Sequence, residues 1–499
     1  MAHRKKRQGK KPKPVFREQV ETAMVDQLLC RFVALVRRGL ELMLTEPSEL
    51  VQKEFRQQPE LVYRAADIPV LVLWTALGVL EWPWAEFKQQ VLAQATWQEV
   101  LEVSTAAELD RLYDPISQWE RLPNRVIELA VHDGLKEGDK REQRPAGQKP
   151  AVQSEVAEFI GASRVVKLLK KQLRPWLKEL DRQDRQQAAH RPRDYRTRSF
   201  LLADVLRWML GLTSTEELRR KLKQHPDLAG AVNFTPGAIP SKATFSRRRL
   251  VVPLDDLKAI LQALVKVLVR CKVIDGRAWV VDLSRVPTYS SVSKTYIESP
   301  NGKSDPQAAF CGYPDNDGGF QFGYCLVWIV DFKSELPLAL VFGAGNAQDS
   351  PLALPLLHQA CAEQPELARR CEYFIGDGSY DTLDFFQFVL HRLRALAAVT
   401  KNPRRTAAPS ADLATDAYCV LRRGTLWYQT LFHCRTSVER ANSWAKLIFN
   451  LKYHKYRGWV AVERCVLFAA IAMLAVAWVA VKTGHPDKIR SARTWISLN

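Results

Sequence analysis

The sequence lacks the cysteine pairs that hold zinc or build a disulfide framework. None of its nine cysteines is spaced as C-x-x-C; they lie at positions 30, 271, 311, 325, 361, 371, 419, 434 and 465. Scattered single cysteines are typical of proteins that stay in a reducing compartment. No apolar h-region follows the basic N-terminus, so a secretory signal is not expected. Both absences predict a cytoplasmic protein.

Negative charge is scarce. The chain has 54 Asp and Glu against 73 Lys and Arg, a formal net charge of +19 and a pI near 9.5. This excess predicts attraction to a polyanion, with nucleic acid the first candidate and an acidic membrane surface the second. The first fourteen residues hold seven cations and no acid. Residues 1–15 are therefore predicted to be a disordered basic arm that contacts DNA phosphates, and the alternative is a solubilising tail.

Long apolar runs are also rare, and one segment could be either a membrane span or a buried helix. Residues 465–481 are seventeen residues without a charge, which is at the short end for a membrane span. The segment is rich in alanine, and Glu463 and Arg464 directly precede it. We expect a buried core helix. A membrane-associated protein is the alternative, and cell fractionation would distinguish the two.

The length of 499 residues is sufficient for several domains. Residues 16–133 show helical periodicity without a readable role, and 134–154, with many glycines, prolines and charges, are expected to be an exposed linker. A second helical region, 155–255, precedes a segment of strands and helices at 256–483. Residues 484–499 are expected to be a C-terminal tail.

The end of the second helical region has the outline of a helix-turn-helix. A basic helix at 218–225 leads through two prolines to Ser241, which can cap a further helix. This second helix would present Arg247, Arg248 and Arg249 to DNA. The alternative is a pair of ordinary packed helices with a basic surface.

From residue 273 the sequence pattern changes to short apolar runs. Strands are predicted at 279–282, 323–331, 338–342, 373–376 and 396–400, and helices at 351–364 and 383–393. The second and third strands are separated by a hairpin-sized connection. Three antiparallel strands followed by alternating helices and strands predict a mixed sheet flanked by helices, an α+β fold.

Three acids occupy informative places in this order. Asp282 ends the first strand, Asp377 follows the fourth, and Glu439 lies on a late helix. If the first and fourth strands are neighbours, as in an RNase H-like sheet, the three carboxylates would meet at one edge. Hard cations such as Mg²⁺ prefer oxygen ligands and share them with substrate phosphates. Two such ions would activate an attacking oxygen and stabilise a leaving oxygen at phosphorus.

The late helix, 431–446, gathers charge on one side. At ~100° per residue, a stripe roughly 60° wide holds Phe432, Arg435, Glu439 and Lys446, and apolar residues fill the opposite side. One carboxylate between two cations suits a metal ion held beside a phosphate. The alternative is a solvated face with an ordinary i,i+4 pair of Arg435 and Glu439.

These blocks resemble the DDE transposases of bacterial insertion sequences, in particular those with a Tyr-x2-Arg-x3-Glu-x6-Lys signature. The signature here reads Phe432-x2-Arg435-x3-Glu439-x6-Lys446. The similarity extends from about residue 240 to about residue 482. It includes the segments Val281-Asp-Leu-Ser284, Asn346-Ala-Gln-Asp349 and Gly376-Asp-Gly-Ser-Tyr-Asp381.

The resemblance implies an RNase H-like catalytic domain in which Asp282, Asp377 and Glu439 are the metal-binding catalytic triad. It also implies that Arg435 and Lys446 contact DNA phosphates. Two departures stand out. Phe432 lacks the hydroxyl of the family's tyrosine, and the 61 residues between Asp377 and Glu439 leave no room for a large β-rich insertion domain.

A protein of this family would use Mg²⁺, with Mn²⁺ as a substitute, and no organic cofactor. Its partner would be double-stranded DNA: the terminal inverted repeats of its element and the target into which the freed 3′-OH is joined. Holding two ends together implies a homodimer on nucleoid DNA in the cytoplasm, without a membrane. The alternative function is a non-catalytic DNA-binding protein derived from a transposase.

Overall fold

The computed structural model describes residues 22–57, 65–80, 84–118, 124–137, 160–187, 195–290, 303–314, 320–402, 418–490 and 496–497. The chain divides into two compact units. The first consists of Met1–Glu137 and Cys371–Cys434, and the second of Gly138–Arg370 and Arg435–Asn499. The expected basic arm, most of the expected linker and part of the expected tail lie outside the described residues.

Seven helices of the first unit come from the N-terminal part of the chain, so the helical character expected there is confirmed. They are α1 (Thr22–Thr45), α2 (Glu49–Gln57), α3 (Ile68–Leu80), α4 (Trp84–Ala93), α5 (Ala95–Leu101), α6 (Ala106–Gln118) and α7 (Asn124–Glu137).

Helices α1 and α7 pack closely because glycines lie at their contact. A Cβ atom on Gly39 would lie 1.8 Å from the carbonyl oxygen of Ala130, and one on Gly134 would lie 2.8 Å from that of Leu35. Glycine removes this obstacle to close approach. The linker therefore does not begin at residue 134 as expected, because Gly134 lies inside α7 and serves helix packing rather than a turn.

The remainder of the first unit is a short βαβ segment followed by a helix. Its elements are β6 (Tyr373–Gly376), α17 (Leu383–Gln387) with a π-helical continuation (Phe388–Leu393), β7 (Leu396–Val399) and α19 (Leu426–His433). Strands β6 and β7 pair in parallel, and every residue of both is buried. The two strands and the helix between them confirm the sequence prediction for this segment.

The N-terminal helices pack against this βαβ segment. The hydroxyl of Tyr373 on β6 donates a hydrogen bond to the carbonyl of Arg31 on α1 at 3.3 Å. The ring of Trp427 on α19 meets that of Trp74 on α3 edge-on, with centroids 4.9 Å apart. The N-terminal region, whose role the sequence did not show, thus supports the strand that leads into Asp377.

The second unit contains most of the remaining helices. They are α8 (Ala162–Gln172), α9 (Arg174–Gln187), α10 (Thr197–Met209), α11 (Thr215–Gln224), α12 (Pro226–Ala231), α13 (Lys242–Arg249), α14 (Leu254–Arg270), α15 (Asp349–Glu363), α16 (Pro365–Arg370), α20 (Thr436–Ser443) and α21 (Trp459–Lys482). A two-stranded parallel pair, β1 (Ile160–Gly161) with β8 (Ile496–Ser497), adds to them.

The region expected to form a helix-turn-helix contains three helices. Ser241 caps α13 as expected, since its side chain accepts a hydrogen bond from the Thr244 amide at 3.2 Å. The short helix α12 lies between α11 and α13 in the chain and was not predicted. Pro226 at its first position explains it, because proline needs no amide partner there and its φ angle suits a helix start.

Four antiparallel strands form the sheet of the second unit. They are β2 (Ala278–Pro287), β3 (Ala309–Pro314), β4 (Phe320–Asp331) and β5 (Pro337–Ala344). Strand β4 pairs with each of the other three, and its Trp328 lies opposite Asp282 of β2 and Leu340 of β5. Strand β3 was not predicted. With the parallel pair of the first unit, these strands confirm the mixed α+β class.

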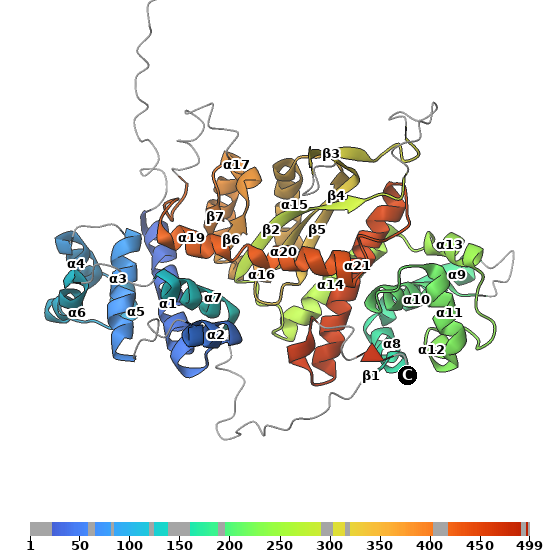
Figure 1. Cartoon of the computed structure of the whole chain (residues 1–499), viewed down its shortest axis with the longest axis horizontal. Helices are drawn as coiled ribbons and strands as arrows, with labels where there is room; N and C mark the ends of the chain where they lie inside the picture. The colour runs from blue at the N-terminus through green and yellow to red at the C-terminus, as the bar shows by residue number, and fades with distance from the viewer. Residues whose placement is uncertain are drawn as a thin grey trace, which may run out of the picture. The chain divides into compact units, whose positions relative to one another are not determined.

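Helix α21 is the core helix of the second unit. It packs against α14 and α10, as Figure 1 shows. By length and composition it could cross a membrane, but 89% of its most apolar window is buried inside the protein. The expectation of a buried helix at 465–481 is confirmed, and this burial accounts for its apolar composition without a membrane.

Candidate active site

Asp282 lies where β2 changes from a wholly buried strand to a partly exposed one. Val280 and Val281 are fully buried, whereas the Asp282 side chain is 13% exposed. Asn442 on α20 donates a hydrogen bond from Nδ2 to Oδ2 of Asp282 at 2.8 Å. Arg435 brings its Nη1 to 3.6 Å from Oδ1 of the same carboxylate. Helix α20 and the residue preceding it therefore hold Asp282 from two sides.

Arg435 also binds Glu439, the other carboxylate of the predicted triad in this unit. Its Nη2 forms a hydrogen-bonded ion pair with Oε1 of Glu439, four residues later. The Glu439 side chain is 50% exposed and that of Arg435 is 25% exposed. The i,i+4 ion pair of Arg435 and Glu439, which a simple solvated helix face would also contain, is therefore present. The structure adds that one guanidinium lies between Asp282 and Glu439.

Lys446 belongs to the same group of charges. It lies in the π-helical turn Trp444–Ile448 that continues α20. Burial lowers the pKa of Lys446, the Asp282 carboxylate acts in the opposite direction, and Arg285 and Lys452 lower it further. Lys446 therefore interacts electrostatically with the Asp282 carboxylate and with two further cations, an arrangement suited to a phosphate.

The prediction of one continuous helix over 431–446 is wrong. Helix α19 ends at His433, and α20 begins at Thr436. The amide of Cys434 bonds to the carbonyl of Leu431, three residues back, which tightens and ends the first helix. Phe432 therefore belongs to α19 of the first unit, where its ring stacks on that of Tyr428. The predicted common stripe does not extend to it.

Asp377 follows β6 in the first unit. It caps the short 3₁₀ turn Gly378–Tyr380, with Oδ1 accepting a hydrogen bond from the Ser379 amide at 2.9 Å. Its neighbour Asp381 is almost completely buried and is held by Arg423 at 2.5 Å. Asp381 therefore has a structural role, whereas Asp377 is a partly exposed carboxylate at the carboxyl end of a buried strand.

Two carboxylates of the predicted triad belong to the second unit and one to the first. Within either unit, the described residues contain no group of three His, Cys, Asp or Glu side chains that could hold a metal ion. The pairing of Asp282 with Glu439 through Arg435 is the part of the predicted site that the second unit brings together.

The three arginines predicted to contact DNA have different surroundings. Arg247 is exposed on α13. Arg248 is partly buried, where its Nη2 donates a hydrogen bond to the carbonyl of Tyr195 at 2.7 Å. Arg249 is buried and paired with Asp204 at 2.9 Å. We therefore no longer assign Arg249 to a DNA contact, because its guanidinium is used inside the protein.

Asn442 was not among the residues predicted from the sequence. A signal was present, because Asn442 lies three residues after Glu439 and so shares its side of the helix. An asparagine at such a position is common on helix surfaces, and its contact with Asp282 depends on strand β2, 160 residues earlier in the sequence.

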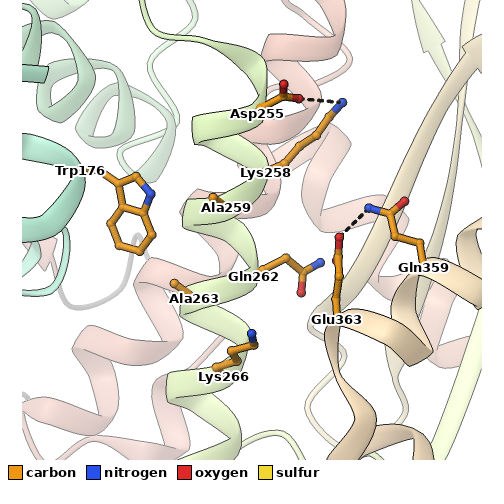
Figure 2. A pocket seen from close by; sticks show the side chains of 9 residues that line it. All are labelled: Trp176, Asp255, Lys258, Ala259, Gln262, Ala263, Lys266, Gln359 and Glu363. Atoms are coloured by element: carbon orange, nitrogen blue, oxygen red, sulfur yellow. Dashed lines mark hydrogen bonds and ion pairs between the residues drawn. The ribbon is translucent and has the colours of Figure 1, made fainter. Parts of the chain in front are cut away.

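A pocket of about 530 Å³ in the second unit is separate from these residues (Figure 2). It lies between α9, α14 and α15 and is lined by Trp176, Asp255, Lys258, Ala259, Gln262, Ala263, Lys266, Gln359 and Glu363. Several of its polar groups already have protein partners: Lys258 lies 3.1 Å from Glu463 and 3.9 Å from Asp255, and Gln359 donates to Glu363 at 2.7 Å. None of the predicted site residues lines it, and we assign it no part in the chemistry.

The family model described as the transposase DDE domain matches residues 274–475. Neither a search of curated proteins nor a search of solved structures returned a significant match. The matched segment contains strands β2 to β7 and helix α20, and the expected RNase H-like class is confirmed. Residues 274–475 of this chain therefore match the DDE domain of transposases.

Proposed function

We propose that this protein is an insertion-sequence transposase that binds the terminal inverted repeats of its element, cleaves there by water attack and joins the freed 3′-OH to target DNA. The observation that carries the proposal is the link from Asp282 through Arg435 to Glu439 inside the family-matched segment. The net charge of +19 supports a DNA partner. Holding two ends calls for a homodimer, acting on nucleoid DNA in the cytoplasm.

Asp282, Asp377 and Glu439 are the residues proposed to hold divalent cations. The residues of the second unit suit such a group, because Asp282 and Glu439 offer carboxylate oxygens. Beside them, the amide oxygen of Asn442 is buried without a hydrogen-bond partner among the described residues. Oxygen donors of this kind suit Mg²⁺, and Mn²⁺ as its substitute. The bound cations would activate the attacking oxygen and stabilise the leaving oxygen of an in-line displacement at phosphorus.

Arg435 and Lys446 are proposed to bind DNA phosphates next to the carboxylates. A guanidinium can bind a phosphate through two parallel hydrogen bonds, so a phosphate can compete with Asp282 and Glu439 for Arg435. Lys446, with Arg285 and Lys452 nearby, adds positive charge on the Asp282 side. The same cations that neutralise the acids of the free protein would thus hold the DNA strand that is to be cut.

Cleavage of the element's own ends tests this function. The DNA flanking the gene is searched for inverted repeats, and the purified full-length protein is incubated with a fragment that carries them. We expect cuts at the repeats in Mg²⁺ or Mn²⁺ and none in Ca²⁺, whose coordination is looser. A fragment with scrambled repeats is the control. Specific binding without cleavage in either metal would favour the non-catalytic alternative, and cleavage without any metal would contradict the mechanism.

Replacing Arg247 tests the contribution of α13 to DNA binding. Because Arg247 is exposed on a capped, basic helix, Arg247→Ala is expected to weaken binding to the element's ends by about 1–3 kcal/mol if it contacts a base. Arg270→Ala, which removes an exposed cation from the end of α14, is the matched control. Titrations of labelled end DNA would measure both. Unchanged affinity in Arg247→Ala would show that recognition lies elsewhere in the chain.

A further inference from the structure

The two ends of the Asn442 side chain are in different situations. Its Nδ2 donates a hydrogen bond to Oδ2 of Asp282 at 2.8 Å. Its Oδ1 is buried and has no hydrogen-bond partner in the described part of the chain. Turning the amide over would not help, because an oxygen would then face the carboxylate and the hydrogen bond would be lost. The orientation is therefore set by Asp282, and the unpaired atom is an acceptor.

A buried acceptor without a donor needs an explanation, since burial removes the water that would otherwise satisfy it. No protein N–H or O–H group of the described residues serves Oδ1. Ordered water and cations are the other classes of partner for an amide oxygen, and hard divalent cations bind such oxygens directly.

The position of Asn442 supports a cation as the partner. It lies on α20 three residues after Glu439, and its amide is in direct contact with Asp282. Both of these carboxylates are joined by the guanidinium of Arg435. The unpaired oxygen therefore belongs to the same group of side chains as the two proposed cation ligands of this unit.

We propose that Asn442 is a positioning residue and an additional oxygen ligand of the divalent cation site. Its Nδ2 holds the Asp282 carboxylate in one orientation, and its Oδ1 supplies a neutral oxygen to the cation. This inference rests on the proposed function, which supplies the cation. A neutral ligand adds an oxygen for the cation without adding another negative charge. In the metal-free protein, the carboxylates therefore repel one another less than they would with a further acid at this position.

Binding of Mn²⁺ to the full-length protein without DNA tests the proposal, measured by calorimetry or by the electron paramagnetic resonance of free Mn²⁺. Asn442→Ala is expected to weaken Mn²⁺ binding by about 10- to 100-fold, the range found when residues that support metal ligands are replaced. Ser443→Ala changes an exposed neighbour on the same helix and should leave the affinity unchanged. Asn442→Asp retains an oxygen but loses the Nδ2 donor to Asp282, so it should bind Mn²⁺ more tightly than Asn442→Ala.

Wild-type Mn²⁺ affinity in Asn442→Ala would overturn the proposal. An Asn442→Asp variant that binds as weakly as Asn442→Ala would also overturn the assignment of the oxygen as a ligand. Circular dichroism of each variant shows whether it is folded, and Asn442→Ser, which leaves a smaller gap, is measured beside Asn442→Ala with the same expected loss. If the wild type itself binds no Mn²⁺, the proposed metal site fails, which is a different result from a failure at Asn442 alone.

Discussion

Asp282→Asn, Asp377→Asn and Glu439→Gln should each lower cleavage of end-bearing DNA by several orders of magnitude. Each change keeps the side-chain volume but removes a negative charge and a good cation ligand. Stabilisation of charge by metal ions and fixed groups is usually among the largest contributions to phosphoryl transfer. The measurement is the rate of cleavage of a labelled fragment that carries the element's ends, in Mg²⁺ and in Mn²⁺.

DNA binding should persist in all three variants, because the cations proposed to contact phosphates remain. It is expected to strengthen slightly in Asp282→Asn, where Arg435 is released from one of its two carboxylates. Asp384→Asn is the matched control, since Asp384 is exposed and lies only seven residues after Asp377. Full cleavage activity in any one of the three variants would remove that residue from the proposed site.

Asp204→Asn is expected to lower the free energy of unfolding by about 3–5 kcal/mol, the range for breaking a buried ion pair by removing one partner. Asp204 accepts hydrogen bonds from Nε and Nη2 of Arg249, the shortest from each at 3.0 and 2.9 Å, and its Oδ1 lies 3.4 Å from Nε of Arg207. The side chains of Arg249 and Asp204 are only 7% and 2% exposed. Without the acid, two buried guanidinium groups lose their main counter-charge.

Urea unfolding of the full-length protein measures the effect. The control is Asp255→Asn in the same unit. The Asp255 side chain is 96% exposed, and that of its partner Lys258 is 46% exposed. Exposed pairs contribute about 0–1 kcal/mol, so the control should differ little from the wild type. Because Arg249 ends α13, loss of the pair should also weaken DNA binding through that helix. A loss of stability below about 1 kcal/mol would show that Thr215 and Tyr456, which also bind Arg249, compensate for the acid.

Most strands and helices near the candidate site could be predicted, because their signals are local. The apolar run at 373–376 coincides with β6, and Ser241 caps α13 as its position suggested. A helix cap or an apolar run depends on residues that are only a few positions apart, so a short stretch of sequence contains the whole signal. Strand β3 was not predicted because its signal is not local. It is short, contains glycine and proline, and is recognisable as a strand through its pairing with β4.

The sequence alone determined the class of the fold, the buried helix at 465–481 and the order of Asp282, Asp377 and Glu439. The tertiary structure decided which charges are available. Arg247 and Arg249 are two residues apart and equally cationic in the sequence. One is exposed and the other is buried, because the partner of Arg249 is Asp204, 45 residues earlier. Contacts between distant segments depend on how the chain folds back on itself, and no local pattern contains them.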